Sequence, residues 1–226
     1  METLVLIPAR KGSKRLPSKN LQRVGNASLL QRTIDHALQV VDISRVFVSS
    51  DSTEILDIAR QNGVIPVNRP QELATDSSTA NDVVSHFIEF IETRSSYAPK
   101  STSILYLQPT SPFRRVETTQ ACMEMFSESG KPVVTIKTMH QHPHKALRLN
   151  HGRIETLHEQ TFPTANHQDL PDFFVATGAL YIFSIVDFLQ TNVIPIAGAM
   201  PFIVDELEGM DIDTYLDLRI ADILEK

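Results

Sequence analysis

The chain has 226 residues, of which 42% are hydrophobic and 21% are charged, a balance typical of one soluble globular domain. Its net charge of -6 excludes the broad basic surface that non-specific nucleic-acid binding requires. Cys122 is the single cysteine, so an intrachain disulfide is excluded, and no apolar run approaches the ~20 residues of a membrane span. We expect one cytoplasmic domain over residues 1–226 that binds neither nucleic acid nor membrane.

The first expected strand, residues 4–8, runs directly into a basic loop. From Arg10 to Arg23 there are six Lys and Arg residues and no acidic one. Ligands of open α/β sheets lie beyond the carboxyl ends of the strands, so a polyanion is expected at this loop. The loop is not a Walker A motif, because Ile7 stands where the upstream glycine is required, and it lacks a Gly-x-Gly-x-x-Gly motif. The alternative is a basic loop that is merely solvated.

Short apolar runs alternate with amphipathic ones along the chain. Apolar, β-branched runs predict further buried strands at residues 45–49, 104–108 and 133–137. Apolar residues spaced by three and four predict helices within residues 29–41, 55–63, 83–91 and 121–126. This alternation predicts an α/β fold with a Rossmann-like, mostly parallel sheet and helices on both faces.

A polar turn follows the strand expected at residues 104–108. Two prolines and two hydroxyl side chains stiffen residues 109–112, and Gln108 offers a ligand both a donor and an acceptor. The alternative is a rigid strand-to-helix turn in which Ser111 caps the next helix. The turn at residues 49–52 allows the same two interpretations.

The alternation breaks at residues 139–172, which are polar and rich in His and Pro. Within them, residues 146–149 and 154–157 predict a small hairpin around residues 151–153. A long segment with little core of its own is typical of a lid, an arm or an oligomer contact. Three alternate histidines, at 140, 142 and 144, could bind zinc on an extended strand, but a surface or arm role is favoured. The sheet is expected to resume at residues 173–183.

Acidic residues precede the last expected helix, residues 214–224. Asp211 and Asp213 point the same way if the segment is extended. Two adjacent carboxylates suit Mg²⁺, which takes one or two of them together with substrate phosphates. The alternative is that Asp213 caps the helix. The two roles can also belong to different carboxylates.

Six short motifs follow one another along nearly the whole chain. They are Pro8-Ala9-Arg10-Lys11-Gly12-Ser13-Lys14 with Lys19-Asn20, Ser49-Ser50-Asp51, Arg69-Pro70 with Leu73-Ala74-Thr75-Asp76, Gln108-Pro109-Thr110-Ser111-Pro112-Phe113-Arg114, His142-Pro143-His144-Lys145, and Asp211-Ile212-Asp213-Thr214. In this order they resemble the CMP-sialic acid synthetase family, the cytidylyltransferases of nonulosonic acids. The resemblance implies the fold of nucleotide-diphospho-sugar transferases.

The resemblance also implies a reaction. The anomeric hydroxyl of a nine-carbon 2-keto acid sugar would attack the α-phosphorus of CTP, giving the CMP-sugar and pyrophosphate. The nucleotide-binding residues would be Ala9, Arg10, Ser13, Lys14, Lys19, Asn20 and Asp76. Arg10, Lys14, Lys19 and Asp211 would be catalytic, and Asp211 and Asp213 would hold Mg²⁺, with Mn²⁺ as a substitute. Gln108, Lys145 and Tyr181 would contact the sugar.

Residues 139–172 would, by the same resemblance, form the dimerisation arm of a homodimer, with Lys145 in its own or its partner's site. Two departures leave the sugar open, since the family's Arg before Leu170 is absent from residues 166–169, and Thr177 replaces its Asn. Legionaminic and pseudaminic acids are therefore candidates beside sialic acid. The rival functions are a nucleotidyltransferase acting on the eight-carbon acid Kdo and a non-catalytic nucleotide-sugar binding module.

Overall fold

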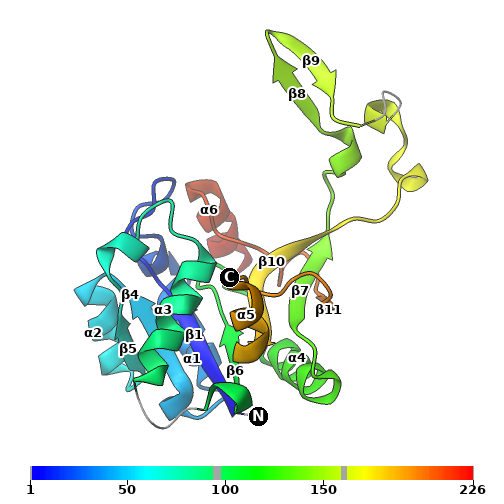
Figure 1. Cartoon of the computed structure of the whole chain (residues 1–226). Coiled ribbons are helices and arrows are strands. Elements are labelled where there is room, and N and C mark those ends of the chain that lie inside the picture. Colours follow the sequence, from blue (N-terminus) through cyan, green and yellow to red (C-terminus); the bar gives the residue numbers. More distant parts are fainter. Residues whose placement is uncertain (1, 94–97, 159–161, 226) are drawn as a thin grey trace.

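The computed structural model describes residues 2–93, 98–158 and 162–225, and a mixed β-sheet lies at its centre (Figure 1). Within these ranges, seven strands follow one another across the sheet in the order β11-β7-β10-β6-β1-β4-β5. Their bounds are β1 (Glu2–Pro8), β4 (Val46–Ser50), β5 (Ile65–Asn68), β6 (Thr102–Tyr106), β7 (Val133–Thr138), β10 (Phe174–Ser184) and β11 (Met200–Ile203). The four strands expected at residues 4–8, 45–49, 104–108 and 133–137 are confirmed within two residues.

The sheet is mostly parallel, as expected. Strand β1 pairs in parallel with β4 and β6, β4 with β5, and β7 with β11. Strand β10 runs antiparallel to both β6 and β7. After β7 the chain leaves the sheet through residues 139–173 and returns as β10 next to β7. A parallel pair needs a crossover connection, usually a helix, and none lies between these two strands among the described residues.

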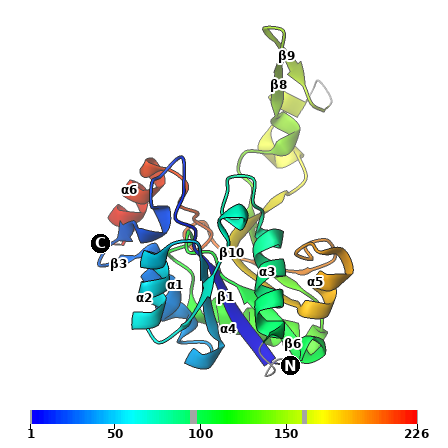
Figure 2. The same cartoon turned by 60° about the vertical axis from the view of Figure 1, so that its left-hand side comes forward.

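Helices cover both faces, because side chains alternate along each buried strand. Val5 and Ile7 of β1 pack in one core with α1 (Leu29–Ala37), α2 (Thr53–Gln61) and α4 (Val116–Ser129). Leu4 and Leu6 face the opposite core, which includes α3 (Ala80–Glu92) and α5 (Ile185–Thr191). Figure 2 shows α1 and α2 on one side of β1, and α3 and α5 on the other.

Among the described strands of the central sheet and the α-helices, three elements lie outside those expected from sequence, and two of them are edge strands. Both β5 and β11 have four residues and contain a proline, Pro66 and Pro201. Proline cannot donate to a β-ladder, so it is tolerated in strands at a sheet edge. Its presence in such a short run also makes the run harder to identify as a strand from sequence. The third element, α5, has only two turns and follows β10 without a loop.

A third, smaller core joins the basic loop to the carboxyl-terminal helix α6 (Tyr215–Leu224). Leu16 of the loop packs with Ile212 and with Leu218 and Ala221 of α6. Thr214 caps α6: its Oγ1 accepts from the Asp217 N–H at 3.2 Å, and Asp217 accepts from the Thr214 N–H at 2.7 Å. The alternative in which Asp213 is the cap is therefore wrong.

Ser111 likewise does not cap the helix after its turn, because Arg115 holds the N-cap position of α4. The chain needs four more residues after Ser111 before it enters the helix. The remaining short elements are β2 (Arg23–Val24), β3 (Ala27–Ser28), and the 3-10 helices η1 (Lys19–Leu21), η2 (Ile43–Arg45), η3 (Gln71–Leu73), η4 (Pro99–Ser101), η5 (Pro143–Lys145), η6 (Phe162–Thr164) and η7 (His167–Asp169).

The predicted hairpin is present and stands away from the central sheet (Figures 1 and 2). Strands β8 (Leu147–Asn150) and β9 (Arg153–Thr156) pair in antiparallel fashion. His151 and Gly152 join them with positive φ angles of 47° and 76°, as a tight hairpin turn requires. Leu149 and Ile154 lie opposite each other and are 75% and 71% exposed. None of the described helices is both long and apolar enough to cross a membrane.

Candidate active site

Two adjoining cavities, of about 310 and 290 Å³, open at the carboxyl ends of the parallel strands. Arg10, Lys19, Asn20 and Asp213 line both of them. The first is also lined by Pro8, Arg69, Ser78, Thr79, Ala80, Val83, Tyr106, Gln108, Pro109, Thr110 and Asp211. The second is also lined by Gly12, Ser13, Lys14, Arg15 and Asp76. Most of the site residues expected from sequence therefore share one region of the molecule.

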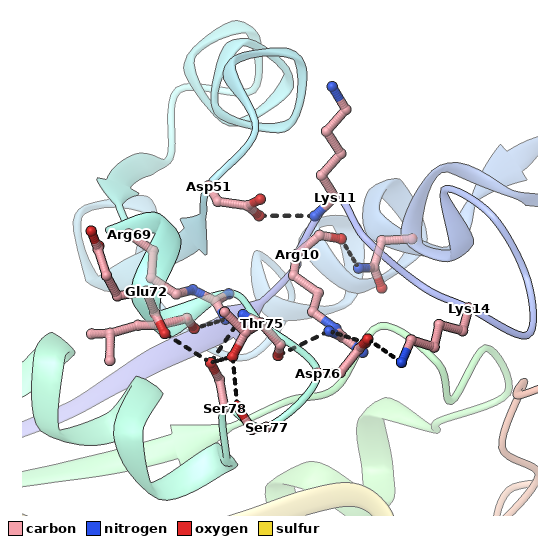
Figure 3. A network of polar contacts seen from close by, with 12 residues as sticks. Arg10, Lys11, Lys14, Asp51, Arg69, Glu72, Thr75, Asp76, Ser77 and Ser78 are labelled. Atoms are coloured by element: carbon pink, nitrogen blue, oxygen red, sulfur yellow. Dashed lines mark hydrogen bonds and ion pairs between the residues drawn. The ribbon is translucent and has the colours of Figure 1, made fainter.

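The basic loop is anchored at both ends by polar contacts. The Lys11 N–H donates to Asp51 Oδ1 at 2.9 Å (Figure 3). Asn20 Nδ2 donates to the Arg10 carbonyl at 2.9 Å. Ala9 is fully buried and lines neither cavity, and its N–H donates to the Ser49 carbonyl at 2.9 Å. In this structure Ala9 therefore joins the start of the loop to β4 and does not line the cavities where the nucleotide was expected.

The cations of the loop converge on two carboxylates. Arg10 Nη1 and Lys14 Nζ lie 3.0 and 2.8 Å from Asp76 oxygens, as Figure 3 shows. Lys19 Nζ and Arg15 Nη2 lie 2.9 and 2.8 Å from Asp213 oxygens. Hydrogen bonds from Lys14 and Arg10 lower the pKa of Asp76. In this structure the two carboxylates neutralise the same cations that could bind a polyphosphate.

The carboxylates expected to hold a metal face the same cavity. Protein atoms that replace water around Asp211 raise its pKa, and the negative charge of Asp213 raises it further against a hydrogen bond with Thr110. Partial burial opposes ionisation of Asp213, but its bonds and charge interactions with Lys19 and Arg15 prevail and lower its pKa. Two oxygen ligands of this kind fit Mg²⁺. No group of three or more His, Cys, Asp and Glu side chains in the described ranges could hold a metal ion.

The three residues expected to contact the sugar are placed differently from one another. Gln108 lines the first cavity together with buried Tyr106, and its side chain lowers the pKa of the Tyr106 hydroxyl against the burial that raises it. Tyr181 packs its ring 6.2 Å from the Tyr106 ring, measured between centroids, and is not among the described residues that line either cavity. Lys145 lies at the base of the arm, outside both cavities, where Nζ donates to the Ala165 carbonyl at 2.6 Å.

The alternate histidines make different polar contacts. His140 Nε2 lies 3.1 Å from Glu206, whereas His142 Nε2 contacts the Pro171 carbonyl at 2.9 Å. The rings of His142 and His144 pack edge-on at 5.0 Å and both contact Phe173. These contacts stabilise the base of the arm.

Arg69 is a cavity residue that sequence analysis placed only in a motif. It is 4% exposed, and its Nη2 donates to the Ser49 carbonyl at 2.6 Å. Its Nε has no hydrogen-bond partner among the described residues, and burial lowers its pKa. The signal that could have identified it is a cation between the end of β5 and Pro70, on the side of the sheet where the carboxyl ends of the strands meet and ligands bind. Tyr106 and Thr110 were likewise missed as cavity residues.

Cys122, interpreted from sequence as a buried structural thiol, is fully buried in α4. Burial raises its pKa to about 12, so the thiol stays protonated at neutral pH.

The amino-acid sequence is similar to those of known proteins over most of its length. The profile of the family described as Cytidylyltransferase matches residues 4–171. The chain belongs to this family. Among its relatives, CMP-N,N'-diacetyllegionaminic acid synthase of Legionella pneumophila is 31% identical over 99% of this chain and 96% of the relative. Pseudaminic acid cytidylyltransferase of Campylobacter jejuni is 27% identical over 100% and 97% of the two chains.

Solved structures share the fold of this cytidylyltransferase at lower identity. A CMP:2-keto-3-deoxy-manno-octonic acid synthetase complexed with CTP superimposes with a TM-score of 0.70 at 16% identity, over 99% of this chain and 98% of that one. A 4-diphosphocytidyl-2C-methyl-D-erythritol synthase gives 0.67 at 14% identity, over 100% and 99%. The expected nucleotide-diphospho-sugar transferase fold is therefore confirmed.

Proposed function

We propose that this cytidylyltransferase transfers CMP from CTP to the anomeric hydroxyl of a nonulosonic acid and releases pyrophosphate. The observation that carries the proposal is the meeting of the basic loop with Asp211 and Asp213 at one cleft beyond the carboxyl ends of β1 and β6. Similarity over nearly the whole length to synthases named for legionaminic and pseudaminic acids supports this acceptor class.

In this proposal the loop cations exchange their carboxylate partners for phosphate oxygens. Arg10, Lys14 and Lys19 donate charge-assisted hydrogen bonds to the triphosphate, and the same donors stabilise the charge that develops on the departing pyrophosphate. Ser13 lines the second cavity and offers a hydroxyl, while Asn20 keeps the loop in place through the Arg10 carbonyl.

Asp211 and Asp213 are proposed to hold Mg²⁺, for which Mn²⁺ can substitute. A cation fits here because it relieves the repulsion between the two carboxylates, which contributes to the raised pKa of Asp211. When bound, it polarises the α-phosphate of the nucleotide. Lys19 and Arg15, which hold both oxygens of Asp213, must release that carboxylate first.

The acceptor is proposed to meet Gln108 in the first cavity. Its carboxamide offers the acid sugar both a donor and an acceptor of hydrogen bonds. Residues 166–169 contain no Arg, and Thr177 is buried with its hydroxyl 2.7 Å from that of Thr135. Both departures point away from ordinary sialic acid, and the relative at 31% identity favours a legionaminic-type acid.

The arm, residues 139–172, is proposed to join two copies of this single-domain chain. A two-stranded hairpin is marginally stable alone in water, and β8 and β9 expose an apolar face that contains Leu149 and Ile154. In this dimer Lys145, at the base of the arm, is expected to serve the site of its own copy or that of its partner. A cytoplasmic location accords with the use of CTP and with the single buried cysteine.

The test is pyrophosphate release from CTP and Mg²⁺ with sialic, legionaminic and pseudaminic acids, and with Kdo because the Kdo-type synthetase shares the fold. Release with one nonulosonic acid, lost when EDTA removes the metal, is expected. Asp213→Asn should lose at least about a hundredfold in kcat, whereas Asp57→Asn, in an exposed ion pair with Arg60, should not. Release only with Kdo, or tight CTP binding without turnover, would replace the proposal by one of its two rivals.

A further inference from the structure

The Gln108 carboxamide is enclosed on two sides in the first cavity. On one side it meets the hydroxyl of Tyr106, which is 2% exposed. On the other side lies the backbone of Gly178 in β10. A Cβ atom at Gly178 would lie only 2.5 Å from Gln108 Oε1, well inside van der Waals contact. The position of the carboxamide therefore depends on the absence of a side chain at residue 178.

Gly178 also has a backbone conformation that other residues rarely adopt, with φ at +77°. It sits in a bulge of β10, where the register with β7 shifts between Ala176 and Tyr181. Buried hydroxyls hold this bulge: Thr177 Oγ1 lies 2.7 Å from Thr135 Oγ1 and accepts from the Ala179 N–H at 3.2 Å. Bulges re-aim side chains at sites beside sheets, and this one presents bare backbone to Gln108.

Arg114 links the backbone next to Gly178 to the backbone of Gln108. It is buried, its Nη2 donates to the Gln108 carbonyl at 2.7 Å, and its Nε donates to the Ala179 carbonyl at 2.8 Å. Burial lowers the pKa of this guanidinium to about 10, so it keeps its charge at neutral pH. One rigid fork of donors thus fixes the backbone of Gln108 relative to the bulge.

We propose that Gly178 is a positioning residue for acceptor recognition. By lacking a side chain it seats the Gln108 carboxamide over the β10 bulge, with Arg114 holding both backbones, so that the amide presents one fixed pattern of donor and acceptor to the hydroxyl or acylamino groups of an acid sugar. This inference rests on the proposed function, in which Gln108 meets the acceptor. It adds two residues to the acceptor site, Gly178 and Arg114, neither of which lines the two cavities itself.

The kinetic test compares Gly178→Ala with Gly198→Ala. Gly198 has a φ of +80°, but a Cβ there meets nothing within 4 Å, so it carries the same backbone strain without the collision. Gly178→Ala should raise KM for the nonulosonic acid by about ten- to a hundredfold, since a shift of the amide by ~1 Å costs that much. KM for CTP should stay within about twofold in both variants. An equal rise of both KM values, or none, would overturn the inference.

A double-mutant cycle with Gln108→Ala tests the same contact by thermal unfolding, which needs no turnover. Gly178→Ala should lower the thermal midpoint slightly more than Gly198→Ala, by about 1–2 °C, because the Gln108 carboxamide must shift away from the new methyl group. In the Gln108→Ala background this extra loss should vanish, since no carboxamide is left to collide. If the losses of thermal midpoint from Gly178→Ala and Gln108→Ala simply add, while the wild type turns over normally, the inference is overturned and the proposed function stays intact. Absence of wild-type turnover with every acid would overturn the proposed function, while the cycle would still decide whether Gly178 seats Gln108.

Discussion

At the scale of single residues, four cations of the basic loop have a carboxylate partner within 3.0 Å. Arg10 and Lys14 share Asp76, and the ion pairs of Asp76 are largely exposed. Such exposed pairs contribute little to stability because water screens them, so a polyphosphate can replace them at little cost. Lys19 differs because its side chain is only 19% exposed. Lys19 is therefore the cation of this loop with the strongest expected effect on the nucleotide.

Lys19→Ala tests that expectation. It should lower kcat/KM for CTP by about a hundredfold or more, because it removes a donor to the triphosphate and to the leaving group. Lys11→Ala is the matched control, since among the described residues Lys11 bonds Asp51 through its backbone N–H and its side chain extends away from Asp76 (Figure 3). Steady-state kinetics should show Lys11→Ala close to wild type. Equal losses in the two variants would place the phosphate contacts elsewhere.

At the scale of secondary-structure elements, the start of α6 governs the position of Asp213. Thr214→Ala removes the capping box and should destabilise the protein by about 0.5–2 kcal/mol, seen as a lower midpoint in urea. Ser28→Ala removes the cap of α1 and should cost a similar amount. Only Thr214→Ala should also lower kcat, because Asp213 directly precedes the cap. A kcat loss of the same size in both variants would contradict this link.

The exposed apolar face of the β8–β9 hairpin is expected to be the main contact between two copies. Leu149→Ser combined with Ile154→Ser should shift the protein from dimer to monomer in light scattering, because these side chains lie opposite each other and are exposed within one chain. Arg153→Ser, on the opposite face of β9, should leave the dimer unchanged. A dimer that survives the double substitution would remove this face of the arm as the main contact.

At the scale of the whole molecule, His36 links stability to pH. Burial lowers its pKa from 6.5 to about 3, with the charge of Arg114 as a further cause, and its Nε2 lies 2.8 Å from Thr119 Oγ1. Between these pKa values the unfolded chain binds the proton and the folded chain does not. Its contribution to the free energy of unfolding is therefore complete above pH 6.5 and falls as the pH drops towards 3.

Urea unfolding at pH 7, 6 and 5 measures this effect. The loss assigned to His36 should approach about 1.4 kcal/mol per pH unit below pH 6. His36→Gln should flatten the slope, whereas His151→Asn, at the exposed hairpin turn, should not. A slope that His36→Gln leaves unchanged would assign the acid sensitivity to other groups.

The sequence predicted those parts of the molecule whose burial leaves a pattern in the chain. Strands β1 and β4, covered on both faces, stand out as apolar runs. The direction of β10 could not be predicted, because periodicity reports burial and not strand polarity. In the site, charge density identified Lys19. Ala9 and Tyr181 were expected at the ligand but lie outside the cavities, since which neighbour a side chain meets depends on register and bulges.

The pairing of the basic loop with Asp76 and Asp213 also has a consequence for which anions can enter. Each carboxylate holds two cations at once, through contacts of 2.8 to 3.0 Å. A single phosphate or chloride ion can compete for only one such pair of cations at a time, whereas three linked phosphates can compete for both. We therefore expect the loop to bind a chain of linked phosphates in preference to a single small anion.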